Sequence, residues 1–163
     1  MALPFILEPR VVIVSSSVRG VGTRALAQFA GRAQRAAGIS GEVHVLITTS
    51  AELRRLNRRF RKKNEATDVL SFPSGEGTLG DLAISAEIAA HNAHRLGHSA
   101  ADEMKILILH GLLHLAGYDH ETDEGAMARK EARLRRTLGL PAALIERTTG
   151  RNGSRPDSKR PRR

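Results

Sequence analysis

The chain has 163 residues, which is typical of one domain, and it has no cysteine, which excludes disulfides and thiolate metal ligands. Its formal net charge of +9, with four Phe, one Tyr and no Trp, favours a polyanionic partner held mainly through its phosphates over an extended base-stacking surface. The longest apolar stretch, 106–116, is too short to cross a bilayer, which takes about 20 residues, and the first ten residues do not resemble a signal peptide, so we expect a cytoplasmic protein without membrane association.

The first part of the chain predicts two strands separated by a helix. A β-branched run at 10–16 predicts a strand, and the alternation of apolar residues over 42–49 predicts a second one. Between them, small and apolar residues recur at helical spacing over 22–37, and Gly38 is expected to end that helix.

A basic helix is expected next. Ser50 is expected to cap it, and its apolar stripe would consist of Leu53, Leu56 and Phe60, which predicts that the helix packs on the core along this stripe. The segment 54–63 contains seven Arg or Lys residues, which fall on the remaining surface of the helix. Such a cluster favours a nucleic acid or an acidic membrane surface, although a solvated face would have the same composition.

The middle of the chain predicts two strands and a short helix. The strands are expected over 67–73 and 79–85, and the glycine-rich turn between them favours a tight connection. Ser85 is expected to cap a helix that runs through Leu96 and stops at Gly97.

Two further helices complete the predicted domain. Ser99 and Asp102 form a capping-box pattern before a helix at 100–116 that is apolar nearly all round, so we expect it in the core. A last helix is expected over 122–138. Four strands with about five helices before, between and after them predict an α+β or α/β fold, in which helices pack on a small mixed sheet.

Three histidines surround the end of the helix at 100–116. His110 and His114 are four residues apart and therefore project from one face of the helix, where two imidazoles can share one metal ion. Gly117 lets the chain leave the helix sharply, which can bring His120 to the same ion. Three such ligands leave a fourth position open, as in catalytic zinc sites.

The spacing of these histidines matches that of the metzincin proteases, with Gly111 where those enzymes carry their catalytic Glu. The ligand set is therefore present without the protease catalyst. The other histidines are interpreted differently: His91, His94 and His98 as a surface feature, and His44 as a satisfied or exposed strand residue.

The segment "HGLLHLAGYDH" resembles the signature of the YbeY family, the bacterial rRNA maturation factors described as metal-dependent endoribonucleases. The segments "LNRRFRKKNEATDVLSFP", "LGDLAIS" and "DHETDEGAMARKEARL" are similar to the family in the same order, so the resemblance covers roughly 50–140. It implies an α+β sandwich with a mixed four-stranded sheet and the helix of the metal ligands in the core. It also implies that His110, His114 and His120 bind zinc and that Arg61 is a functional arginine near the metal. The partners that it implies are small-subunit rRNA and ribosomal proteins or a ribosome-associated GTPase.

We therefore predict a single metallo-endoribonuclease domain at 1–147, followed by a basic, disordered tail at 148–163. The predicted activity is zinc-dependent cleavage of single-stranded RNA in 3′-end maturation of small-subunit rRNA and in ribosome quality control, with one zinc ion per chain and no small organic cofactor. Arg61 would neutralise phosphoryl charge. Asp119 would move a proton or orient a ligand, and Asp81 is a weaker candidate for the same work.

Two alternatives to this activity stay open. One is a zinc-stabilised, non-catalytic RNA-binding assembly factor, because the spacing of ligands predicts metal binding and not turnover. The other is a metzincin-like peptidase, against which Gly111 speaks. Nickel or another divalent ion would also accept three imidazoles.

Overall fold

The computed structural model describes residues 11–15, 21–75, 78–119 and 121–141. The tail expected at 148–163 lies outside these ranges. Within them the chain forms a four-stranded mixed sheet and five helices, which confirms the α+β class. The strands are β1 (Val11–Ser15), β2 (Glu42–Thr48), β3 (Val69–Pro73) and β4 (Thr78–Ser85), and the helices are α1 (Thr23–Ala37), α2 (Ser50–Arg61), α3 (Ala86–Leu96), α4 (Ala100–Leu115) and α5 (Ala126–Leu138).

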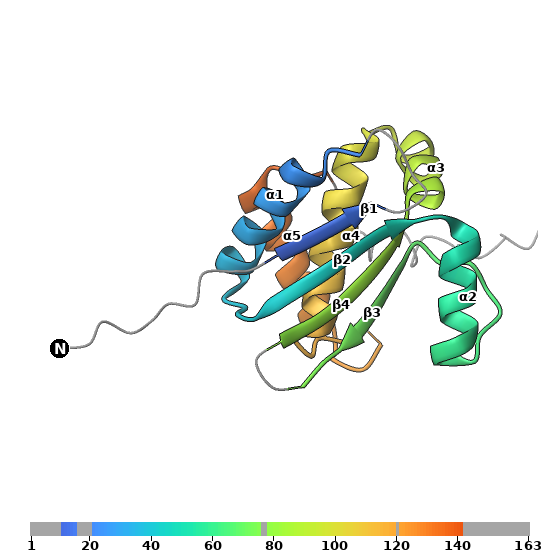
Figure 1. Ribbon diagram of the computed structural model, residues 1–163. Helices are drawn as coiled ribbons and strands as arrows, with labels where there is room; N and C mark the ends of the chain where they lie inside the picture. The colour runs from blue at the N-terminus through green and yellow to red at the C-terminus, as the bar shows by residue number, and fades with distance from the viewer. Residues whose placement is uncertain (1–10, 16–20, 76–77, 120, 142–163) are drawn as a thin grey trace, which may run out of the picture.

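The sheet has the order β1-β2-β4-β3, with β1, β2 and β4 parallel and β3 antiparallel to β4 (Figure 1). The alternation read from 42–49 is present in β2, where Val43, Val45 and Ile47 are buried while His44 is exposed. The sheet therefore has one face that carries the main core, as an amphipathic strand requires.

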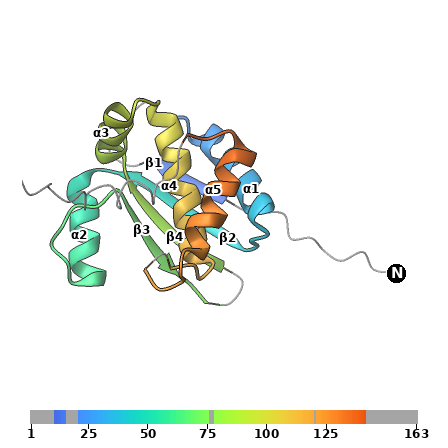
Figure 2. The same cartoon turned by 180° about the vertical axis from the view of Figure 1, so that it is seen from behind.

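Helices α1, α4 and α5 lie on the face of the sheet that carries the main core, as the view from behind shows (Figure 2). Every residue of α4 from Ile106 to Leu113 is buried, which confirms the prediction that this helix lies in the core. Each fully buried Leu or Ile contributes about 1.5–3 kcal/mol to folding, so this one helix supplies a large part of the driving force. None of the helices in the described part of the chain has the length and apolar character of a membrane span.

Helix α2 packs on the other face of the sheet, against β3 and β4. Its contact is a small second core of Leu53 with Leu70 and Ala83, to which Leu56 adds a partly buried side chain. The third member of the predicted stripe does not join: Phe60 is 58% exposed. The prediction that the whole stripe packs on the core is therefore wrong at Phe60, in the last turn of α2.

The serine N-caps predicted for α3 and α4 are correct, and the one predicted for α2 is wrong. The hydroxyls of Ser85 and Ser99 accept hydrogen bonds from the Ile88 and Asp102 amides, as predicted for N-caps. At α2 the cap is Thr49, whose hydroxyl accepts from the Glu52 amide. Ser50, the predicted cap, is the first helical residue, and its hydroxyl instead bonds to that of Ser85.

The last helix begins four residues later than the sequence predicts, at Ala126. Glu124 and Gly125 have φ of 54° and 87°, a left-handed conformation that a continuous right-handed helix excludes. The carboxylate of Asp123 accepts hydrogen bonds from the Gly125 and Met127 amides. The acidic run before α5 is therefore a turn that caps the helix and not its first turn.

Candidate metal centre

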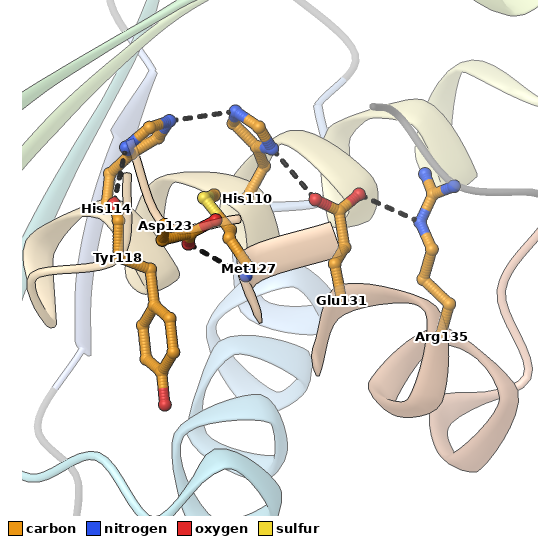
Figure 3. Close-up of polar contacts among 7 residues, drawn as sticks. All are labelled: His110, His114, Tyr118, Asp123, Met127, Glu131 and Arg135. Carbon is orange, nitrogen blue, oxygen red and sulfur yellow. Dashed lines mark hydrogen bonds and ion pairs between the residues drawn. The ribbon is translucent and has the colours of Figure 1, made fainter. Parts of the chain in front are cut away.

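His110 and His114 lie near the C-terminal end of α4, just before the turn that contains Gly117. His110 is 8% exposed and His114 is half-buried. The Nε2 atoms of the two rings lie 3.1 Å apart, so they converge on one point, as the i, i+4 spacing predicts (Figure 3).

The other nitrogen of each ring is held by a hydrogen-bond partner. Nδ1 of His110 lies 2.9 Å from Oε2 of Glu131, and Nδ1 of His114 lies 3.0 Å from the carbonyl oxygen of Tyr118 (Figure 3). Both partners are acceptors, so each Nδ1 carries the proton and each Nε2 presents a lone pair. This arrangement is the one that histidine ligands of metal ions adopt in proteins.

Glu131, on α5, is completely buried and belongs to a polar row that crosses from α4 to α5. Its second oxygen lies 3.3 Å from Nε of Arg135, which is 2% exposed (Figure 3). Sequence reasoning missed Glu131. The signal was present, because Met127, Glu131 and Leu134 share the i, i+4, i+7 spacing of a buried stripe. A buried carboxylate in such a stripe requires a hydrogen-bond donor or a cation as its partner.

A cleft of about 440 Å³ opens beside the two histidines. Its wall opposite α4 comes from β3 and from Arg61 at the end of α2. The guanidinium of Arg61 donates a hydrogen bond of 2.5 Å to the carbonyl oxygen of Ser71 and lies over the ring of Phe72, 5.8 Å from its centroid. The structure thus brings Arg61 to the same cleft as His110 and His114, although 49 residues separate it from the first histidine.

Two carboxylates also line the cleft. Asp119 is exposed and organises the turn after α4, since its Oδ1 accepts from the Glu121 amide and its carbonyl oxygen accepts from the Thr122 and Asp123 amides. Asp68, which sequence reasoning did not single out, precedes β3, and burial raises the pKa of its carboxyl above the usual range. Asp68 therefore holds its proton more tightly than an exposed aspartate does.

The remaining candidates lie away from this cleft. Asp81 is not among the residues that line it, and its carboxylate instead accepts from His44, which also bonds to Glu42. His44 is thus both exposed and satisfied, as predicted. His98 corrects the surface interpretation, because its ring is mostly buried and lies 2.5 Å from the buried carboxylate of Glu103.

The two histidines fit a zinc ion. Ligands at about 2.0–2.1 Å in tetrahedral geometry stand about 3.3–3.4 Å apart, close to the observed separation of the Nε2 atoms, and the Nδ1 partners leave both lone pairs available. His120, the third expected ligand, lies outside the described residues. Among the residues inside them, no group of three or more His, Asp or Glu side chains is arranged to hold a metal.

Gly111 explains why no metzincin-type glutamate follows the first histidine. A Cβ atom at this position would lie 2.7 Å from a methyl carbon of Leu82, because α4 crosses β4 at this glycine. A side chain here would thus point into the sheet and not into the cleft, so position 111 cannot supply the general base of a peptidase.

Comparisons with known proteins concern the sequence and the fold of the chain. The sequence model of the family described as Endoribonuclease YbeY matches residues 11–139. Proteins named Endoribonuclease YbeY from Koribacter versatilis and Solibacter usitatus are 55% and 56% identical over 140 and 123 residues, which cover 85% and 76% of this chain and 92% and 84% of the relatives. A solution structure of a Thermotoga maritima protein superposes with a TM-score of 0.58 at 25% identity, over 92% of this chain and 99% of that one.

Proposed function

Because the chain belongs to the endoribonuclease YbeY family, we propose that it hydrolyses phosphodiester bonds of single-stranded RNA at a zinc ion held by His110, His114 and His120. The observation that carries this proposal is the pair of imidazoles whose Nε2 atoms lie 3.1 Å apart at the cleft, with each Nδ1 engaged by an acceptor. When bound, the ion supplies Lewis-acid chemistry at a phosphate oxygen and makes water acidic enough to attack near neutral pH.

Arg61 is proposed to bind and neutralise the phosphate group. One of its nitrogens donates to the Ser71 carbonyl, which fixes the guanidinium at the wall of the cleft opposite the histidines. The planar fork of the side chain suits two phosphate oxygens at once, and a preorganised cation stabilises the charge that grows during phosphoryl transfer.

Asp119 is proposed to orient the turn that carries His120. Its contacts with the Glu121, Thr122 and Asp123 amides support this role, and its exposure at the cleft also leaves it able to accept a proton from water. In Asp119→Asn, full metal content with unchanged cleavage would remove it from both roles.

The substrate is proposed to be the 3′ region of small-subunit rRNA, with ribosomal proteins or a ribosome-associated GTPase as partners in maturation and ribosome quality control, in the cytoplasm. The basic segment 54–63 supports a phosphate-rich partner, since most of its side chains are exposed on α2 next to the cleft. The same surface also fits a second function, that of a zinc-stabilised assembly factor that binds rRNA without cleaving it.

One experiment separates these functions. Zinc content by mass spectrometry and cleavage of a labelled small-subunit rRNA 3′ fragment are measured for the wild type, His114→Ala and His94→Ala, the last being an exposed histidine of α3 that serves as the control. About one zinc per chain in the wild type and the control, with metal and cleavage both lost in His114→Ala, supports the metallonuclease. Metal binding without cleavage by any preparation supports the assembly factor, and absence of bound metal refutes the site.

A further inference from the structure

The end of α2 carries an exposed aromatic ring next to the cleft. Phe60 is 58% exposed, and the other exposed large hydrophobic residues of the described chain, Val12 and Val14, lie on β1. Strands β1 and β3 are the opposite edges of the sheet, so Phe60 is not part of a continuous apolar patch. A single ring is too small for a stable protein interface, which commonly buries about 800 Å² on each partner.

Phe60 connects to the cleft through ring contacts. Its ring meets that of Phe72 edge-on, with the centroids 5.6 Å apart and the planes at 68°. The guanidinium of Arg61 lies over the same Phe72 ring, and Arg61 itself lines the cleft. Phe60 therefore lies one aromatic ring away from the arginine that is proposed to hold the phosphate.

A guanidinium group lies over this ring, within the basic segment 54–63. The guanidinium of Arg59 lies 5.2 Å from the Phe60 centroid, and the neighbouring Arg58 and Lys62 are exposed. Lys62 ends α2 in the left-handed conformation, with φ of 55°, a position that glycine occupies with less strain. A residue in a left-handed conformation thus follows the exposed Phe60 two positions later.

We propose that Phe60 and Arg59 form a stacking subsite for one unpaired base of single-stranded RNA, whose backbone runs past Arg61 into the cleft. An unpaired nucleotide presents a planar apolar face beside a negative phosphate, which matches an exposed ring flanked by guanidinium groups. Because every base has such a face, the subsite would position RNA without selecting its sequence. This inference rests on the proposed function, and it adds a contact for the base to the contacts for the phosphate.

The test measures binding of the full-length protein to an unstructured single-stranded RNA that carries one 2-aminopurine, by the quenching of its fluorescence and by affinity at several salt concentrations. The variants are Phe60→Ala, Phe60→Leu and Phe60→Trp, with Val14→Ala as a control at another exposed hydrophobic residue. A second RNA has an abasic site in place of 2-aminopurine. Thermal melting by circular dichroism verifies that each variant is folded.

We expect Phe60→Ala and Phe60→Leu to lose the quenching and to weaken binding about 5- to 100-fold, while Phe60→Trp and Val14→Ala bind like the wild type. The slope of affinity against salt should stay unchanged, because no charge is removed. Unchanged affinity and quenching in Phe60→Ala, or an equal loss on the abasic RNA, would overturn the subsite. If quenching depends on Phe60 but the wild-type protein does not cleave RNA, the subsite is supported and the proposed enzyme is refuted.

Discussion

Replacing Glu131 tests whether the buried row His110–Glu131–Arg135 both stabilises the fold and sets the metal site. In Glu131→Ala, the Nδ1 atom of His110 and the guanidinium of Arg135 each lose a carboxylate partner, at 2.9 and 3.3 Å, inside the core. Removing one member of a buried ion pair costs about 3–5 kcal/mol, a large fraction of the roughly 5–15 kcal/mol by which such a domain is stable. Urea unfolding followed by circular dichroism in EDTA measures this loss without any contribution from metal.

The same substitution should weaken zinc binding about 10- to 100-fold, because loss of the partner that orients a ligand histidine has effects of that size. Competition with a chromophoric chelator measures this affinity. Glu65→Ala, which removes an exposed carboxylate, serves as the control and should change neither quantity.

A double substitution separates the two effects. Glu131→Leu with Arg135→Met removes both charges and fills the space with apolar atoms, which often restores the stability of a buried pair. We therefore expect the double variant to be more stable than Glu131→Ala but less stable than the wild type, because Nδ1 of His110 still lacks its acceptor, and we expect zinc binding to stay weakened. If Glu131→Ala unfolds within about 1 kcal/mol of the wild type, or if the double variant recovers full zinc affinity, the role assigned to this row is wrong.

Three further predictions concern packing, pH and metal removal. Gly111→Ala should lower the free energy of unfolding by about 1–3 kcal/mol, because the new Cβ overlaps Leu82. Gly97→Ala is not a suitable control for this substitution, since the φ of Gly97 is 77°. Hydrogen bonds that His44 donates to the carboxylates of Asp81 and Glu42 raise its pKa above the ordinary 6.5, so this pairing stabilises the fold below that pH and is lost as pH rises through the raised value. His44→Gln should thus cost up to about 1 kcal/mol near pH 5.5 and nothing measurable at pH 8.5, by urea unfolding at both. EDTA should abolish cleavage while the circular dichroism spectrum stays unchanged, because the buried hydrophobic core carries the fold; loss of helical signal would contradict this.

The elements that could be predicted from the sequence are those set by local interactions. Ser85, Ser99 and Gly38 each end or begin a helix through contacts within a few residues, and these positions were correct. The spacing of His110 and His114 likewise fixes their side of α4 before any tertiary contact is known.

The features that could not be predicted depend on contacts between distant elements or on competing turns. The buried stripe of α5 indicates that Glu131 is inside, but its partner His110 is 21 residues away on α4, and no local pattern encodes that contact. Phe60 has the right spacing for a buried stripe, but the helix extends beyond the small core that covers Leu53. The start of α5 was misplaced because an acidic run suits either a first helical turn or a capping turn, and Asp123 selects the second.

The burial of α4 also bears on which metal the chain would carry in a cell. Core packing around α4 holds the two imidazoles in place, so their side chains would need little ordering when an ion binds. Any divalent metal that accepts nitrogen ligands would therefore meet the same preorganised pair. Intrinsic affinity at such sites follows the Irving–Williams series, in which copper and nickel compete strongly with zinc. The occupant would then be decided by the metal supply of the host and by the proteins that buffer it, so metal content measured after overexpression reflects the growth medium as well as the protein.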